Sequence, residues 1–194
     1  MSGVGEIWLI RHGETAWSLS GQHTGRTDVP LTPEGVRQAE ALGDRLAGKQ
    51  FALVLTSPRA RARETCRLAG LAGAAKVDDD LAEWDYGDLE GRTSAEIRGE
   101  IPGWTIWSGP VPGGETAAQV GARADRVLAR AREVAGNVAL FAHGHLLRVA
   151  AARWLGLPPA EGRLFALDTA SVSVLGLEQG LPVIRSWNVR CGGE

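Results

Sequence analysis

The chain has 194 residues, of which 44% are hydrophobic and 23% are charged, and its formal net charge is −2. These are ordinary values for a globular protein with a sizeable hydrophobic core. A near-neutral charge argues against a general nucleic-acid or membrane-surface binder, and no apolar stretch approaches the length of a membrane-spanning helix. We therefore expect a single domain over residues 1–194, with neither nucleic acid nor a membrane as a partner.

The cysteines and the N-terminus indicate a cytoplasmic protein. Cys66 and Cys191 are the only cysteines, so they can form at most one disulfide, and they do not have the spacing of a metal site. Cys66 falls within a helical pattern and is predicted to be a buried free thiol. The first six residues show no basic region followed by a long apolar run, so no signal peptide is expected.

The first part of the chain predicts a strand, a loop and a helix. The apolar residues within 5–10 indicate a buried strand, and the polar, Gly- and Thr-rich stretch 14–31 indicates a long loop. Thr32 is expected to cap a helix that has Pro33 in its first position and fades near Gly48.

A second strand and helix follow. Residues 51–55 form an apolar run that predicts another buried strand. Ser57 is expected to cap the next helix, with Pro58 in its first turn, and this helix continues through Leu68. Its sequence is rich in arginine, so it brings positive charge close to the end of the second strand.

The remaining elements continue the alternation. Residues 75–78 suit a short strand, residues 93–100 a short helix, and residues 102–114 a surface excursion. The last predicted elements are a helix from Glu115 to Val134, a strand over 137–142, a helix through Trp154, and strands over 171–175 and 182–184. Strands that alternate with helices predict a three-layer α/β sandwich with a mainly parallel central sheet.

Two of the predicted strands end in a histidine followed by glycine. Arg11-His12-Gly13 follows the first strand, and His143-Gly144 follows the strand over 137–142. Ligands bind at the carboxyl ends of strands in open α/β sheets. Arginine binds phosphate bidentately, and a neutral imidazole is a nucleophile near pH 7. We expect Gly13 to allow a sharp turn through its backbone freedom.

These strand ends predict a small positive pocket of phosphate size. Helix N-termini at Pro58 and Gly144 would add backbone N–H groups and positive dipole ends. No Gly-rich Walker loop is present, which argues against nucleoside triphosphates. Taken alone, Arg11 and His12 are equally compatible with a simple strand cap. His143 and His145 also suit a metal pair, although no third ligand has suitable spacing.

Four stretches resemble the motifs of the histidine phosphatase superfamily, which includes the cofactor-dependent phosphoglycerate mutases. Leu9 to Thr15, with the sequence LIRHGET, resembles the signature motif. The others follow in the expected order: Ser57 to Thr65, Leu81 to Gly87 with Glu90-Gly91, and Ala142-His143-Gly144. Four ordered motifs are far more specific than any one of them. The resemblance covers nearly the whole chain and implies a phosphoglycerate mutase-like fold.

The resemblance also implies a mechanism. His12 would attack phosphorus and become phosphohistidine, while Arg11, Arg61 and His143 would stabilise charge on the phosphoryl oxygens. Glu83 would protonate the leaving oxygen and then deprotonate the attacking water. No cofactor and no metal is implied, because the arginines supply the positive charge.

Further residues are candidate substrate contacts by the same resemblance. They are Ser18, Thr24, Gly25, Tyr86 and Gly144. Whether His23, Arg63 and His145 contact substrate is left open by the sequence. The implied partner is a small phosphorylated molecule, and a homodimer fits the habit of the family.

The motifs favour a phosphatase over a mutase. The segment from Gly91 to Gly114 is short, and Arg92 and Arg98 are its only basic residues, whereas mutases carry extra basic residues there. Ser18 stands where many mutases have Asn. We expect hydrolysis of a small phosphomonoester such as a sugar phosphate, as in the acid phosphatase and sugar bisphosphatase-like branch. The alternatives are a cofactor-dependent phosphoglycerate mutase and a catalytically idle binding module.

Overall fold

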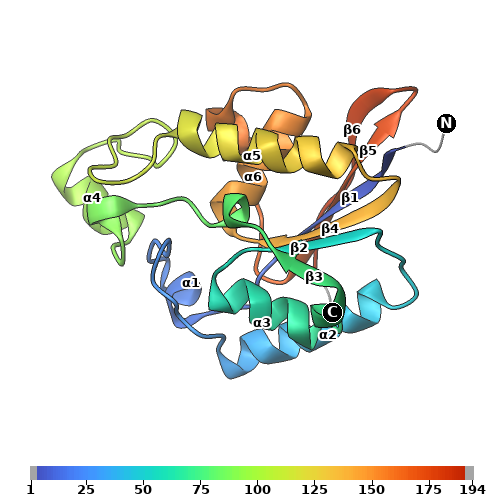
Figure 1. The fold of residues 1–194 in the computed structure, drawn as a ribbon. Helices are drawn as coiled ribbons and strands as arrows, with labels where there is room; N and C mark the ends of the chain where they lie inside the picture. The colour runs from blue at the N-terminus through green and yellow to red at the C-terminus, as the bar shows by residue number, and fades with distance from the viewer. Residues whose placement is uncertain (1–3, 191–194) are drawn as a thin grey trace.

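The computed structural model of the protein describes residues 4–190. In this part of the chain six strands form one sheet in the order β3-β2-β4-β1-β5-β6, with helices on both faces (Figure 1). The strands are β1 (Val4–Arg11), β2 (Leu53–Thr56), β3 (Ala75–Val77), β4 (Gly136–Ala142), β5 (Ser171–Glu178) and β6 (Leu181–Arg190). The helices are α1 (Ala16–Ser20), α2 (Pro33–Leu46), α3 (Ala60–Leu68), α4 (Ser94–Glu100), α5 (Ala117–Arg132) and α6 (Gly144–Trp154).

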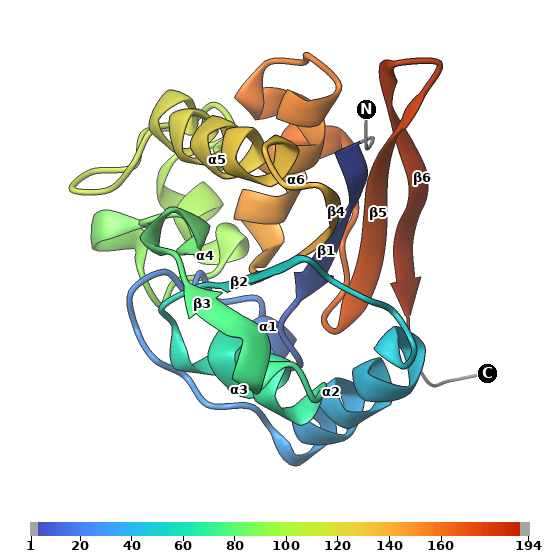
Figure 2. The ribbon, with the colours of Figure 1, turned by 45° about the vertical axis from the view of Figure 1, so that its right-hand side comes forward.

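The sheet is parallel over its first four strands and antiparallel at one side. β3, β2, β4 and β1 run parallel to one another, β5 runs antiparallel to β1, and β6 antiparallel to β5. Helices α5 and α6 cover one face, and α2 and α3 cover the other (Figure 2). The predicted three-layer α/β fold with a mainly parallel sheet is confirmed.

The layers follow from the two-residue period of the strands. In β1, Ile7 and Leu9 pack into the core cluster that contains the buried residues of α5 and α6. Trp8 and Ile10 point the other way, into the cluster shared with α2 and α3. Because both faces are buried, a one-residue slip would leave the large Trp8 ring in the wrong layer. The packing therefore fixes where β1 ends.

Three parallel strands end at the same edge of the sheet. Arg11 pairs with Ala142 across β1 and β4. The His12 N–H donates to the Ala142 carbonyl at 3.0 Å, and the Ser57 N–H donates to the Phe141 carbonyl at 2.9 Å. Backbone hydrogen bonds thus bring the residues that follow β1, β2 and β4 together.

Two predicted segments are corrected by the structure. The expected loop over 14–31 contains helix α1, whose N-cap Thr15 and Ser18 hydrogen-bond each other's backbone N–H. This capping box was missed because its third position is serine, where Glu or Gln is usual. The last strand is β6, which extends well beyond the predicted 182–184, because pairing with β5 holds polar residues in the extended conformation.

The roles expected of Ser57 and Gly13 also change. Helix α3 is capped at Arg59 without a side-chain bond, and Ser57 Oγ accepts the Arg59 N–H at 3.2 Å from outside the helix. Gly13 does not have a positive φ angle. Glycine is needed there because a Cβ would lie 2.3 Å from the carbonyl oxygen of Gly35. The turn after β1 is therefore packed tightly against the start of α2.

The structure also bears on the predictions for Cys66 and for membrane-spanning helices. Cys66 is a buried free thiol, as predicted, and burial raises its pKa to about 12. Cys191 lies outside the described residues. Between residues 4 and 190, no helix combines the length and the apolar character needed to cross a bilayer.

Candidate active site

His12 lies directly after β1 and is buried, with 5% of its surface exposed. Its Nδ1 hydrogen donates to the Gly13 carbonyl at 2.7 Å, which leaves the lone pair on Nε2. Burial lowers the pKa of His12 well below its usual value, and the charges of Arg61 and Arg11 lower it further. His12 is therefore a neutral imidazole with a fixed tautomer, which is the form required of a nitrogen nucleophile.

A second neutral imidazole lies beside it. The ring centroids of His12 and His143 are 5.2 Å apart, and His143 is completely buried. Its Nε2 hydrogen-bonds Ser57 Oγ at 2.7 Å, while its buried Nδ1 has no partner among the described residues. Burial and the charge of Arg61 lower the pKa of His143 well below its usual value. An unpartnered ring nitrogen next to His12 is suited to contact a phosphoryl oxygen.

Arg11 and Arg61 supply fixed positive charge. Arg11 donates to the Leu167 carbonyl, and Gly144 lies against its guanidinium. Arg61 is 1% exposed and donates to the carbonyls of Thr24 and Thr27 at 2.8 and 3.0 Å. These carbonyls hold its position, and the buried Nε of each arginine has no partner in the described chain. Each guanidinium therefore keeps hydrogen-bonding capacity for an anion.

Glu83 is held by the first turn of α6. Its carboxylate accepts hydrogen bonds from the backbone N–H groups of Trp84 at 2.9 Å and of His145 and Leu146 at 3.0 Å. These three N–H donors fix the position and orientation of the Glu83 carboxyl group. The N-terminus of α6 was expected to bind phosphate directly. Instead, two of its first N–H groups are used to position Glu83.

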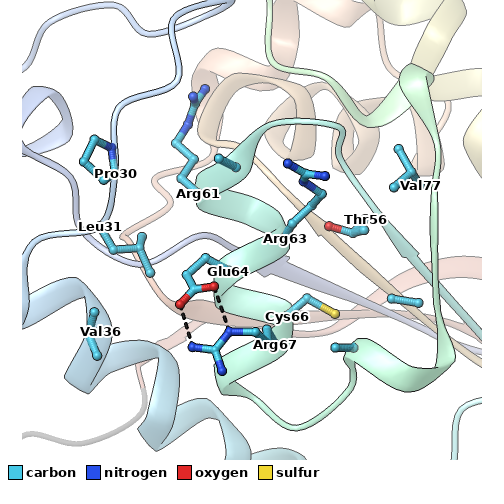
Figure 3. Close-up of a pocket in the computed structure, with 13 residues that line it drawn as sticks. Pro30, Leu31, Val36, Thr56, Arg61, Arg63, Glu64, Cys66, Arg67 and Val77 are labelled. Atoms are coloured by element: carbon cyan, nitrogen blue, oxygen red, sulfur yellow. Dashed lines mark hydrogen bonds and ion pairs between the residues drawn. The ribbon is translucent and has the colours of Figure 1, made fainter.

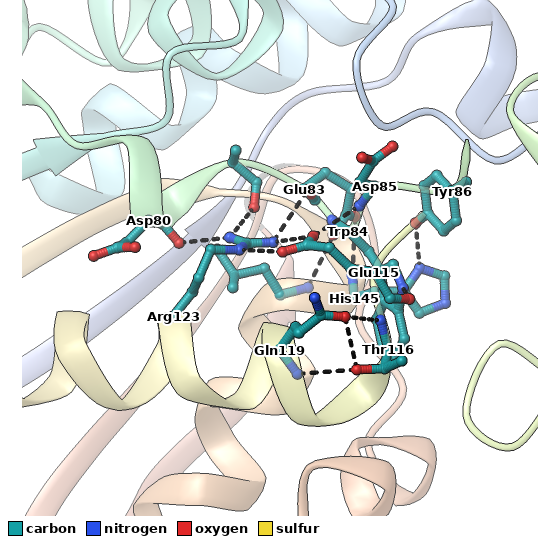
Figure 4. Close-up of polar contacts among 12 residues, drawn as sticks. Asp80, Glu83, Trp84, Asp85, Tyr86, Glu115, Thr116, Gln119, Arg123 and His145 are labelled. Atoms are coloured by element: carbon teal, nitrogen blue, oxygen red, sulfur yellow. Dashed lines mark hydrogen bonds and ion pairs between the residues drawn. The ribbon is translucent and has the colours of Figure 1, made fainter. Parts of the chain in front are cut away.

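A partly buried ion pair between Arg123 and Glu115 holds the loop that carries Glu83 (Figure 4). Arg123 of α5 donates to the carbonyls of Asp80, Ala82 and Glu83 at 2.8, 2.9 and 3.3 Å. The same guanidinium donates to both carboxylate oxygens of Glu115 at 2.7 Å. We call this pair the Arg123–Glu115 clamp. It ties three carbonyl groups of the loop backbone to α5 and so limits how far Glu83 can move.

One cavity of about 230 Å³ contains the reactive groups. Arg11, His12 and Glu83 line it together. Four predicted substrate contacts also line it: Ser18, Thr24, Tyr86 and Gly144. His23 and His145, whose contact with substrate the sequence left open, lie there as well, together with Arg148. The predicted residues therefore converge on one small space next to the strand ends.

Three other predicted residues do not line this cavity. Arg61 and His143 are neighbours of His12 instead: the His143 ring centroid is 5.2 Å from that of His12, and the charge of Arg61 lowers the pKa of His12. The Gly25 N–H is bound by the Glu90 carboxylate at 3.0 Å, and the Gly25 carbonyl faces Arg61. Gly25 thus holds the loop that positions Arg61, and a direct contact with substrate stays a prediction.

A larger pocket of about 660 Å³ lies elsewhere, between α2, α3 and β3 (Figure 3). Its lining is largely apolar, with Leu31 and Val77 among the residues. Arg63 lies here and not in the cavity with His12. The Cys66 thiol in this pocket has a raised pKa, so it is a poor nucleophile. The thiol of this pocket is therefore no candidate nucleophile, and Arg61 lines the pocket from the side that borders the site.

Possible metal ligands near the site are bound to other side chains of the protein instead. Asp80 binds Arg126 and Arg130, and Asp78 binds Arg130 at 2.8 Å. His145 Nδ1 is bound by the Tyr86 hydroxyl at 2.6 Å. Within residues 4–190, no three His, Cys, Asp or Glu side chains are grouped so that they could hold a metal ion.

A neutral imidazole, two fixed guanidinium groups and a buried carboxylate around one small cavity define a phosphoryl-transfer site. The sequence model of the histidine phosphatase superfamily (branch 1) matches residues 7–190. The chain therefore belongs to this superfamily, as predicted, and it is a phosphatase.

Relatives and solved structures agree with this assignment. The chain is 46% identical over 179 residues to an acid phosphatase of Mycobacterium tuberculosis, which covers 90% of this chain and 88% of that protein. It is 41% identical over 182 residues to the sedoheptulose 1,7-bisphosphatase of Saccharomyces cerevisiae, covering 77% and 67% respectively. A solved structure of an open reading frame product from M. tuberculosis has a TM-score of 0.93 and 42% identity, and covers 97% of this chain and 99% of that one.

Proposed function

We propose that this phosphatase hydrolyses small phosphomonoesters, with sugar phosphates as the favoured class, through a phosphohistidine on Nε2 of His12. The observation that carries the proposal is the His12 tautomer. The hydrogen bond from Nδ1 to the Gly13 carbonyl leaves the Nε2 lone pair available in the cavity that Glu83 also lines. The small volume of that cavity limits the substrate to a short molecule.

The first chemical step would transfer the phosphoryl group to the enzyme. The lone pair of His12 Nε2 attacks phosphorus, and the bond from phosphorus to the ester oxygen breaks. Glu83 in its acid form gives its proton to that oxygen, so the leaving group departs as a neutral alcohol. Arg11, Arg61 and His143 contact the phosphoryl oxygens, where negative charge is concentrated.

The second step would release the phosphate. The Glu83 carboxylate takes a proton from water, and the water oxygen attacks phosphorus as the bond to Nε2 breaks. His12 recovers its lone pair, and Glu83 is again protonated for the next cycle. No further reactant is needed beyond water, so the cycle closes as a hydrolysis.

Several contacts favour hydrolysis over the mutase reaction. Arg92 binds Glu100 at 2.6 Å, and Arg98 donates to the Trp104 carbonyl at 3.1 Å. Neither arginine lines the cavity, so the segment from Gly91 to Gly114 brings no positive side chain to a phosphoglycerate carboxylate. Ser18 lines the cavity, but its hydroxyl is used in the cap of α1.

Sugar phosphates are favoured by the named relatives, which include a sedoheptulose 1,7-bisphosphatase. A cytoplasmic location is part of the proposal, because Cys66 is a buried free thiol. We also take residues 1–194 as one domain, since the six strands of the described part share one sheet. The homodimer stays a prediction that a measurement of mass in solution would test.

The proposal is tested by phosphate release from a panel of sugar phosphates and phosphoglycerates, with His12→Ala as the blank. We expect hydrolysis of sugar phosphates by the wild type and none by the variant. Val77→Ser, which changes an exposed residue of the other pocket, is the matched control and should keep full activity. Interconversion of phosphoglycerates that requires a bisphosphoglycerate would replace this proposal with the mutase.

A further inference from the structure

We propose that His145 is a specificity-determining residue, which donates a hydrogen bond from Nε2 to an oxygen on the leaving group of the substrate. It would make the enzyme prefer phosphomonoesters of polyhydroxylated, sugar-like alcohols over those of plain alcohols. This inference rests on the proposed function, because it concerns the leaving group in the same site.

The position of His145 places it beside the leaving group. Its backbone N–H donates to Glu83 Oε2 at 3.0 Å, and the residue lines the cavity that contains His12. In the proposed mechanism Glu83 protonates the ester oxygen. The carbon atoms attached to that oxygen therefore lie next to His145.

Tyr86 fixes which nitrogen of His145 carries the proton. The Tyr86 hydroxyl and His145 Nδ1 are 2.6 Å apart. Burial raises the pKa of Tyr86 well above its usual value, so the phenol keeps its hydrogen. Burial also lowers the pKa of His145 well below its usual value, so the ring is neutral. The Tyr86 hydroxyl has no other partner among the described residues, so its hydrogen is paired only if it donates to His145 Nδ1. A neutral imidazole that accepts at Nδ1 carries its own hydrogen on Nε2.

The surroundings leave Nε2 as an available donor. No described residue binds it, and it is not among the ring nitrogens sealed from solvent. Three aromatic rings hold the imidazole in place, with centroids 5.2 Å away for Trp107, 5.9 Å for Tyr86 and 6.2 Å for Trp84. The N–H is therefore presented in one direction, without the entropy cost of ordering a flexible side chain.

The polar groups next to His145 are already engaged in other contacts. His23 packs 6.0 Å from His145 and hydrogen-bonds Ser94 through Nε2 at 3.2 Å. The Arg148 Nε donates to the Gly162 carbonyl at 3.1 Å, and its guanidinium lies over the Trp107 ring. His145 is thus an unengaged donor close to Glu83, and a hydroxyl oxygen is the acceptor that suits it.

The test uses two substrates that differ only in hydroxyl groups, propyl phosphate and glycerol 1-phosphate. The readout is the ratio of kcat/KM for glycerol 1-phosphate to kcat/KM for propyl phosphate, in which a general loss of activity cancels. We expect the wild type to favour glycerol 1-phosphate. In His145→Leu the ratio should fall by about 3- to 10-fold, the effect of losing one neutral hydrogen bond. His145→Gln keeps an N–H donor and should retain most of the preference.

Tyr86→Phe provides an independent variant. Nitrogen NMR of the wild type should show His145 neutral with its proton on Nε2, whereas the variant should show both tautomers and a reduced substrate ratio. An unchanged ratio in His145→Leu, or a wild-type proton on Nδ1, would overturn the inference. If the wild type hydrolyses neither phosphate, it is the proposed function that fails.

Discussion

The two ends of the catalytic cavity are built in different ways. At the phosphate end, His12 and His143 follow paired strands, and main-chain hydrogen bonds between β1 and β4 fix their separation. At the leaving-group end, His23 and Ser94 lie outside the sheet and His145 in the first turn of α6. Arg11 and Arg61 give the phosphate end its charge, whereas the other end presents neutral imidazoles beside a single guanidinium, that of Arg148. The rigid strand edge thus positions the catalytic groups, while the sequences of loops and helix N-termini can differ between enzymes that act on different substrates.

Glu83 marks the boundary between the two ends, and its replacement should give the largest effect. In Glu83→Gln the first step on glycerol 1-phosphate should slow by about 10²- to 10⁴-fold, because no proton reaches the poor leaving group. With p-nitrophenyl phosphate, whose leaving group needs no proton, rapid mixing should still show a burst of nitrophenol before slow turnover. An equal loss of the burst with both esters would show that Glu83 does not protonate the leaving oxygen.

Acidification should test the buried histidines at both ends. Burial lowers the pKa of His23 from its usual value to about 4. Below pH 6.5 the unfolded chain binds a proton that the folded chain does not, so stability that is present above pH 6.5 is lost as the pH falls. At pH 4 the loss from this histidine is on the order of 3 kcal/mol.

The measurement is urea unfolding between pH 8 and pH 4. The wild-type free energy of unfolding should fall below pH 6.5, and His23→Gln should fall less steeply. His143 is also buried with a lowered pKa, so a pH-dependent loss should remain in that variant. Identical slopes for the two proteins would contradict the assignment of a buried neutral His23.

The Arg123–Glu115 clamp should matter for proton transfer more than for binding. Arg123→Met removes the hydrogen bonds to the loop that carries Glu83. We expect kcat on glycerol 1-phosphate to fall about tenfold, because a less well positioned Glu83 loses only part of the rate that proton transfer contributes. KM should change little. Arg126→Met is the matched control, because the Arg126 side chain binds only the exposed side of Asp80. Equal effects of the two substitutions would rule out a positioning role for the clamp.

Ser57 should give a smaller effect at the phosphate end. Its Oγ accepts the Arg59 N–H, so its own hydrogen is available for His143 Nε2, which would leave the ring proton on Nδ1. We expect Ser57→Ala to lower kcat/KM by about 3- to 10-fold and to mix the tautomers of His143 in nitrogen NMR. Ser57→Thr should restore both. A His143 tautomer that is the same with and without the hydroxyl would refute this role.

The sequence predicted the sheet well, and the residues expected at the phosphate end lie at its strand ends, for a physical reason. Buried parallel strands are continuous apolar runs, and the motif residues directly follow them, as His12 and His143 do. Helix α1 was missed because its cap uses Ser18 in place of a longer acid. The extent of β6 was missed because pairing with β5, and not its own composition, makes it a strand.

The leaving-group end could not be predicted in the same way. The hydrogen bond between Tyr86 and His145 joins residues 59 positions apart, and Arg123 reaches Ala82 across 41 positions. No local pattern encodes such contacts, because they depend on how α5 and α6 pack against the loop. Ser57 lay inside a predicted motif, but its hydroxyl was assigned to a helix cap when it in fact reaches His143.

The proposed hydrolysis depends most directly on Nε2 of His12 as the phosphoryl acceptor. The measurement is a rapid acid-free quench of the wild type with labelled p-nitrophenyl phosphate, followed by mapping of the labelled peptide. We predict an acid-labile, base-stable label on His12 that is absent from His12→Ala. A label on another residue, or full turnover by His12→Ala, would contradict it.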